Sequence, residues 1–255
     1  MSGLLLRLAG PLQSWGERSA FTPVRDSAPF PTRSALTGIL AAAEGQARND
    51  DRLDAYDRLQ FTVRVDRPGV LLVDYHTAGG GFPKAQTPAT SGGSNKGAAV
   101  ITRRHYLADA VFTIAVTGPE NDTARIAHAL QHPHWAPYLG RRSCVPDEPF
   151  LLRAHVADPV DELLHRVPLS REPAHPAPET VPVTFLYEHA PTPLPDTEVD
   201  ILTANDYPVS FAQHRRSHRT RRIYRVEHHL AHALTCPSRQ LTDQLIDYCL
   251  EENAA

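Results

Sequence analysis

Residues 4–9, LLLRLA, form a short apolar run that GPLQSWG (residues 10–16) ends at once. A run of this length that stops at Gly-Pro predicts a buried β-strand opening into a turn-rich loop. The loop carries Trp15, whose indole either is exposed for stacking or plugs the edge of the sheet. The elements that follow this strand then decide the fold class.

Helical and extended patterns alternate over the next 140 residues. Thr32 is a natural N-cap for a helix over 33–44, and Gly45 is its stop. The other expected elements are a short helix near 50–58, a half-buried strand over 60–66, strands over 70–76 and 106–116, a helix over 119–131 and a strand after Phe150. This order suits an α+β, ferredoxin-like or RRM-like sandwich. The glycine-rich segment 77–97 has no helical period and is predicted to be a mobile insertion.

Beyond residue 157 the composition changes. Nine prolines between Pro159 and Pro195 predict an irregular, acidic connector. A smaller β-rich portion follows, with strands expected over 207–211 and 222–228 and a final helix over 238–252 capped by Ser238. We therefore divide the chain into an RRM-like domain, 1–156, and a connector with a C-terminal subdomain, 157–255.

The charge is segregated along the chain. A net charge of −3 speaks against a nucleic-acid binder, since such domains are usually basic. However, 24 of the 26 basic residues are arginine, because only Lys84 and Lys96 are lysine. Six of these arginines lie between Arg215 and Arg225 with no acid among them. This arginine run is expected either to line a nucleic-acid channel or to pair with the acidic connector.

Two further segments combine paired arginines with aromatic rings. They are TRRHY (residues 102–106) and PYLGRRSCVP (residues 137–146). Guanidinium groups bind phosphate and stack on bases, so this combination suits RNA better than it suits a solvated hairpin. The FPTRS segment (residues 30–34) lies at the start of the expected helix, where it either binds an anion or only caps the helix.

The sequence gives little support for a metal site, a hydrolase or a nucleotide-binding loop. The three cysteines form no CxxC pair, and HExxH, GxSxG and P-loop patterns are absent. His228, His229 and His232 invite a metal hypothesis, but a histidine-rich surface is the default, and no metal or cofactor is expected. A ribonuclease that needs no metal stays open, with His76 and His105 or Tyr106 as base and acid. With no signal peptide and no long apolar run, the chain is expected to be soluble and cytoplasmic.

Several strings together resemble a known family. They are LLLRLAGPLQSWG (4–16), FPTRSALTGILAA (30–42), DYHT (74–77), RRHYLADAVF (103–112) and PYLGRRSCVPDEPF (137–150). In this order they are similar to the type I-E branch of the Cas "five" family, subunits of the CRISPR Cascade complex in the RAMP superfamily. The resemblance is weak over 157–255, where its best part is 207–226.

The resemblance implies an RRM-like body with a protruding thumb, here about 78–103. It also implies a non-catalytic subunit that holds the 5′ handle of the CRISPR RNA, caps the CasC backbone near CasA, and touches target DNA only indirectly, with no membrane partner. The type I-C relative is an endoribonuclease, so that activity and a purely protein-binding cap are the alternatives. By motif position the expected RNA-binding residues are Gln13, Ser14, Trp15, Arg33, Ser34, Lys84, Lys96, Arg103, Arg104, Tyr106, Tyr138, Arg141 and Arg142.

Overall fold

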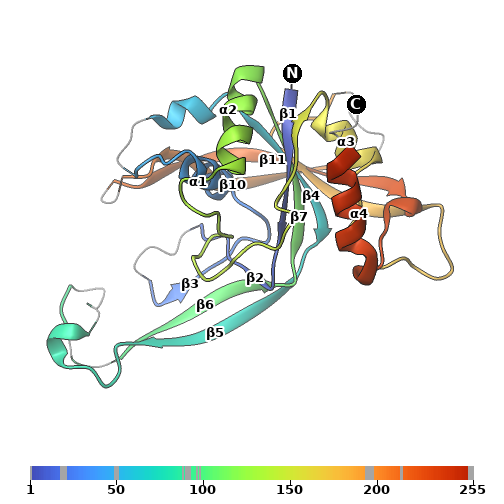
Figure 1. Ribbon diagram of the computed structural model, residues 1–255. Helices are drawn as coiled ribbons and strands as arrows, with labels where there is room; N and C mark the ends of the chain where they lie inside the picture. Colours follow the sequence, from blue (N-terminus) through green and yellow to red (C-terminus); the bar gives the residue numbers. More distant parts are fainter. Residues whose placement is uncertain are drawn as a thin grey trace.

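A seven-stranded antiparallel sheet forms the centre of the molecule (Figure 1). The computed structural model describes residues 2–17, 22–48, 52–87, 89, 93–95, 97, 99–192, 198–212 and 215–251. The strands run in the order β10-β11-β9-β4-β7-β1-β8. Their bounds are β1 Ser2–Ala9, β4 Gln60–Arg67, β7 Val111–Gly118, β8 Leu151–Val156, β9 Thr180–Tyr187, β10 Val199–Ser210 and β11 Ser217–Ala231.

Helices cover both faces of this sheet. Helices α1 (Arg33–Ala43) and α2 (Glu120–Gln131) share one apolar core with Leu4, Leu6 and Leu8 of β1. Helices α3 (Pro159–His165) and α4 (Ser238–Leu250) share a second core with Leu5. Side chains alternate between the faces of a strand, so a strand covered on both sides needs an unbroken apolar run. This explains why LLLRLA shows no alternation.

Local signals set the ends of α1 as expected. The Thr32 side chain accepts a hydrogen bond from the backbone N–H of Ala35, which satisfies a free donor of the first turn. Gly45 follows the C-cap with φ of +72°, a conformation that glycine adopts without strain. The predicted helix 119–131 and the strands at 4–9 and after Phe150 are likewise present.

Strand β4 is buried more deeply than its alternation predicted. The expectation of a half-buried strand is wrong because Arg64 and Asp66, on its polar side, are both fully buried. The Arg64 guanidinium donates to both carboxylate oxygens of Asp66 and to the carbonyl oxygens of Leu163, Val167 and Pro168. All five donors of the guanidinium are thus used, which makes its burial possible.

A long hairpin projects from the body (Figure 1). Strands β5 (Val70–Ala78) and β6 (Val100–Ala108) pair along their whole length. Short strands β2 (Leu12–Gln13) and β3 (Val24–Arg25) flank β6, and a 3₁₀ turn, η2 (Lys84–Gln86), lies in the connection. The single strand expected over 106–116 is therefore two strands, β6 and β7, because the chain turns at Asp109, where φ is +61°.

The segment 157–195 is more regular than its prolines suggested. It contains α3 and β9, so the expectation of an irregular connector is wrong there. Strand β9 tolerates Pro182 and pairs with β4, Thr62 lying opposite Tyr187. The division at residue 157 stays a prediction about the sequence, and the two parts share one sheet. The remaining short turns are η1 (Arg52–Tyr56) and η3 (His232–Leu234).

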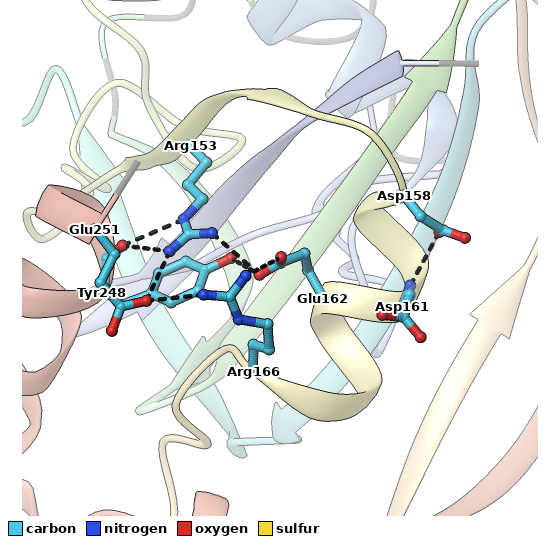
Figure 2. A network of polar contacts seen from close by, with 7 residues as sticks. All are labelled: Arg153, Asp158, Asp161, Glu162, Arg166, Tyr248 and Glu251. Carbon is cyan, nitrogen blue, oxygen red and sulfur yellow. Dashed lines mark hydrogen bonds and ion pairs between the residues drawn. The ribbon is translucent and has the colours of Figure 1, made fainter. Parts of the chain in front are cut away.

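A polar network anchors the end of α4 (Figure 2). Arg153 on β8 donates to the Tyr248 carbonyl oxygen at 2.8 Å, and its guanidinium carbon lies 3.8 Å from the centroid of the Tyr248 ring. The Tyr248 hydroxyl donates to Glu162 of α3 at 2.7 Å, and Glu251 accepts from both Arg153 and Arg166. The helix begins after Pro237, and Ser238, the expected cap, instead donates its backbone N–H to Glu172.

Across the described residues, no helix combines the length and apolar character that a membrane crossing requires.

Candidate nucleic-acid interface

Two loops meet at the base of the β5–β6 hairpin. The backbone N–H of Ser14 donates to the Leu139 carbonyl oxygen at 3.1 Å, and the Ser14 hydroxyl donates to the His105 carbonyl oxygen at 3.0 Å. The approach is close at Gly140, where φ is +84° and a Cβ would lie 1.7 Å from the Ser14 carbonyl oxygen. Only glycine allows both this backbone conformation and this contact.

The same junction joins the two motifs of arginine and aromatic ring. The guanidinium carbon of Arg141 lies 4.3 Å from the centroid of the Tyr106 ring. Its Nη2 donates to the carbonyl oxygen of Arg25 in β3 at 3.2 Å. Strand β3 runs parallel to β6, with Arg25 beside Arg104. Three segments of the chain therefore bring arginines and a ring together at one place, which we call the basal site: Arg25, Arg104, Tyr106 and Arg141.

Arg103 and Arg104 point to opposite faces of the hairpin. Successive residues of a strand alternate, whereas residues directly opposite each other on paired strands share a face. Arg104 therefore shares its face with Tyr106 and with Asp74, its partner on β5. Arg103 shares the other face with Tyr75, whose side chain is exposed. The sequence placed both arginines in one motif, but only Arg104 lies on the face of the basal site.

Trp15 is fully buried in the apolar core that α1 and α2 cover, so the expectation of an exposed indole is wrong. Its ring N–H donates to the Gln13 side-chain oxygen at 3.2 Å. The Gln13 amide in turn donates to the carbonyl oxygens of Leu8 and Ala110. Gln13, Ser14 and Trp15 are thus buried and hold the loop in place, with no free ring face for a base to stack on.

Arg33 and Ser34 are also occupied within the chain. Arg33 forms a buried ion pair with Glu188 of the acidic segment and donates to the carbonyl oxygens of Tyr56 and Leu59. Its backbone N–H donates to the Asp206 carboxylate at 2.7 Å, and the Ser34 hydroxyl lies 3.1 Å from the His218 ring nitrogen. A carboxylate of this chain therefore occupies the position at the start of α1 where an external anion was expected to bind.

The other expected residues lie at different places. Tyr138 is half-buried and Arg142 is exposed in the loop after α2, while Lys84 is exposed in the far turn of the hairpin. Lys96 lies outside the described residues. Arg25 is the residue that sequence reasoning missed, since the two-residue strand β3 has no pattern of its own.

His228, one of the three histidines that suggested a metal site, packs against aromatic side chains. The His228 ring nitrogen lies 2.9 Å from the Tyr187 hydroxyl, and its ring meets Phe185 edge-on at 4.8 Å. Burial lowers the pKa of His228. In the part of the chain that is described, no three His, Cys, Asp or Glu side chains gather as metal ligands would.

Comparisons with known proteins agree on one family. The model of the family described as CRISPR-associated protein (Cas5) matches residues 3–224. The Cascade subunit CasD of Escherichia coli K12 is 38% identical over 182 residues, which cover 66% of this chain and 78% of that relative. A chain of a solved CRISPR RNA-guided surveillance complex is 48% identical, with a TM-score of 0.86 over 97% of this chain and 99% of that one. A crystal structure of a Cas protein is 28% identical, with a TM-score of 0.59 and coverage of 91% and 97%. The chain therefore belongs to the CRISPR-associated CasD/Cas5 family.

Proposed function

We propose that this chain is a non-catalytic, RNA-binding subunit of a type I-E Cascade effector. In this proposal it holds the 5′ handle of the guide RNA and caps the CasC backbone during antiviral DNA interference. The observation that carries the proposal is the basal site, where Arg141 stacks on Tyr106 beside Arg104 and Arg25. The structural relative from an RNA-guided complex supports it.

The chemistry of the basal site fits single-stranded RNA. A guanidinium that lies on a ring is fixed in orientation, so it loses little entropy when it binds a phosphate or stacks on a base. Stacking on such a surface contributes about 1–3 kcal/mol per base. Asp74 is the acid nearest in register to Arg104, and it lies 3.7 Å from His76, with which it can pair. Among the described residues, neither Arg104 nor Arg141 forms an ion pair with an acid, which suits binding of an anionic ligand.

The hairpin is proposed to be the thumb, and to contact a neighbouring subunit such as CasC. Its first strand carries apolar side chains that are exposed on both faces, an unusual arrangement for a monomer. Val70 and Val73 are 71% and 52% exposed, and Tyr75 is 64% exposed. Lys84 at the far turn is placed to reach RNA or the same neighbour.

We also propose that the core is ferredoxin-like and of the RAMP type. Strands β1, β4, β7 and β8, with α1 after β1 and α2 after β7, follow the β-α-β-β-α-β order of that fold. In the sheet they are adjacent in the order β4-β7-β1-β8, so β1 and β7 are central. In this interpretation β9, β10 and β11 extend the sheet on the β4 side.

The positions of the candidate acid and base support a role without catalysis. His76 lies opposite Thr102, and His105 lies opposite Val73, so the two rings point to opposite faces of the hairpin. An acid and a base that act on one phosphodiester must both be within hydrogen-bond reach of it. Tyr106, the other candidate, is buried beneath Arg141.

The test uses the purified full chain and a labelled single-stranded RNA with the handle sequence. Fluorescence anisotropy should show salt-dependent binding, and incubation in EDTA should leave the RNA intact. Discrete cleavage that is lost in the His76→Ala or His105→Ala variants would establish the endoribonuclease instead. Normal RNA affinity after the double change Arg104→Ala and Arg141→Ala, with loss of CasC co-purification on deleting the hairpin, would establish the protein-binding cap.

A further inference from the structure

Two arginines of the run on β11 are paired within the chain. Arg221 pairs with Asp206 at 2.6 Å and with Glu188 at 3.2 Å, and Arg225 bonds Asp200 at 3.0 Å. Glu188 and Asp200 belong to the acidic stretch of the sequence, so for these two arginines the expected pairing with that stretch is confirmed. The β5–β6 hairpin, in contrast, carries a row of exposed apolar side chains.

The two faces of the β5–β6 hairpin differ in exposure. On β5, Tyr75 is exposed, whereas Asp74 and His76 on either side of it are half-buried. On β6, Arg103 is exposed, whereas Thr102 beside it is buried. Because side chains alternate between the faces of a strand, the chain covers part of one face and leaves the other open. The partly covered face is the one that carries the basal site.

Side chains from three strands lie in register on the uncovered face. Tyr75 of β5 lies opposite Arg103 of β6, and Arg103 lies beside Val24 of β3. Residues in register on neighbouring strands share a face. We call this set of exposed residues the open face: Val24, Leu71, Val73, Tyr75, Ile101 and Arg103. The hairpin extends away from the main sheet (Figure 1), and each of the five uncharged side chains is at least 44% exposed.

The chemistry of the open face suits a protein better than RNA. Its only full charge is that of Arg103, and the other five side chains are aliphatic or aromatic. RNA affinity depends on several cations, each of which neutralises a phosphate. The centres of protein interfaces are instead depleted in charge and enriched in tyrosine and arginine. Since monomers rarely expose a contiguous apolar patch, the open face has the composition of a protein interface.

The charge of Arg103 favours a different protein over a second copy of this chain. In a symmetric dimer the same patch would face itself, so the open face would have to supply an acid for each Arg103. The described residues of the open face include no acid, and Asp74 lies on the opposite face of the hairpin. A different protein can bring its own carboxylate to Arg103, which makes the two surfaces complementary in charge.

We infer that the open face of the hairpin binds a neighbouring protein subunit, through apolar contacts around Tyr75 and an ion pair between Arg103 and a carboxylate of that subunit. The inference rests on the proposed function, in which CasC is the neighbour of the hairpin and RNA lies on the basal site. Adjacent residues of β6 then have different ligands, because Arg103 contacts the protein and Arg104 contacts the RNA.

The experiment measures how much CasC the tagged full chain retains after co-expression with CasC and guide RNA, in washes of increasing sodium chloride. Tyr75→Ala should retain about tenfold less CasC at every salt concentration, because salt does not screen an apolar contact. Arg103→Ala should retain severalfold less at low salt and approach the native chain at high salt, because screening weakens the ion pair in the native chain. Arg103→Lys should keep most of the retention.

His76→Ala is the matched control, since His76 is adjacent to Tyr75 on β5 but lies on the opposite face. It should retain CasC as the native chain does. The second measurement is the anisotropy of labelled single-stranded RNA with each isolated chain. Tyr75→Ala and Arg103→Ala should bind RNA within about twofold of the native affinity, whereas Arg104→Ala should bind it about tenfold more weakly. Thermal unfolding of each variant identifies any loss that comes from misfolding.

The outcomes separate the open face from the proposed function. If Tyr75→Ala and Arg103→Ala retain as much CasC as the native chain, the open face is not the contact, and the proposed function stands. If either variant loses as much RNA affinity as Arg104→Ala, the open face binds RNA and the inference is wrong. If light scattering shows a dimer of the native chain that Tyr75→Ala abolishes, the partner is a second copy instead. A native chain that retains no CasC or binds no RNA contradicts the proposed function itself.

Discussion

The guanidinium carbon of Arg141 lies 4.3 Å from the centroid of the Tyr106 ring, although the two residues are 35 positions apart and belong to different loops and strands. The contact depends on the hydrogen bonds that Ser14 makes to Leu139 and His105, one to each segment. A buried loop near the N-terminus therefore helps to position a half-buried arginine of another loop. Four predictions follow from this arrangement and from the buried groups around it.

The two adjacent arginines of β6 should differ in their effect on RNA binding. Arg104→Ala removes a cation on the face of Tyr106 and Arg141, so we expect about tenfold weaker binding of single-stranded RNA. Arg103→Ala changes the opposite face and should have a smaller effect. Anisotropy titrations at one salt concentration compare the two. Equal losses would mean that the RNA surrounds the hairpin instead of lying on one face.

Gly140→Ala should disrupt the basal site. The new Cβ would lie 1.7 Å from the Ser14 carbonyl oxygen in a backbone conformation that alanine avoids. The loop must move, so Arg141 should leave Tyr106, and RNA affinity should fall together with the melting temperature. Strain of this kind costs about 1–3 kcal/mol before the steric clash is counted.

Gly38→Ala is the control for that change. Gly38 lies inside α1, and an added Cβ would meet nothing within 4 Å. Alanine has the higher helix propensity, so this variant should be about 0.5–1 kcal/mol more stable with unchanged RNA binding. If Gly140→Ala is as stable as the native chain and binds RNA equally well, Gly140 is not what fixes the loop.

Arg33→Ala should lower the free energy of unfolding, and its effect on RNA affinity should be the smaller one. Its side chain is 4% exposed and pairs with Glu188, which is 7% exposed. Removing one partner of a buried ion pair costs about 3–5 kcal/mol, and Arg221 should keep the effect at the lower end because it also pairs with Glu188. Urea unfolding measures the loss. Arg58→Ala is the control, since the Arg58 side chain is 65% exposed and its ion pair with the buried Asp122 should contribute about 1 kcal/mol at most. A stable Arg33→Ala variant with weak RNA binding would restore Arg33 as a contact residue.

Local patterns in the sequence predicted most of the elements and only part of the site. Thr32 and Gly45 fix α1 through contacts within a few residues, so a sequence pattern is enough to find them. The burial of Arg33 depends on its ion pair with Glu188, which is 155 residues away in the sequence. No local sequence signal predicts that ion pair. Burial of Trp15 was one of two open alternatives, because an apolar ring with one N–H fits both an exposed and a buried setting.

The same limit explains why the sequence did not predict the burial of β4. The continuous run in β1 and the alternating run in β4 suggested different burial, yet both strands are covered on both faces. The alternation in β4 comes from Arg64 and Asp66, which satisfy each other inside the core. A pattern records polarity, whereas burial also depends on partners that only the fold brings together.

Acid should destabilise the fold through His228. Because burial disfavours the protonated imidazole, the pKa of His228 lies below the usual 6.5 in the folded chain. The unfolded chain thus takes up a proton at a higher pH than the folded chain does. The free energy of unfolding should therefore fall as the pH drops from about 6.5 toward the folded-state pKa, and this contribution is complete only above about 6.5. His218, whose pKa burial also lowers, contributes in the same direction.

The His228→Gln variant should show a weaker pH dependence of the free energy of unfolding between pH 7 and pH 5 in urea titrations. Its amide can still bond the Tyr187 hydroxyl but cannot take up the proton. His229→Gln is the control, because the side chain of His229 is 56% exposed on the adjacent position of β11, so its pH profile should match that of the native chain. If His228→Gln and the native chain show the same slope, the imidazole of His228 is not the group through which acid acts, and His218, beside Ser34, becomes the next residue to replace.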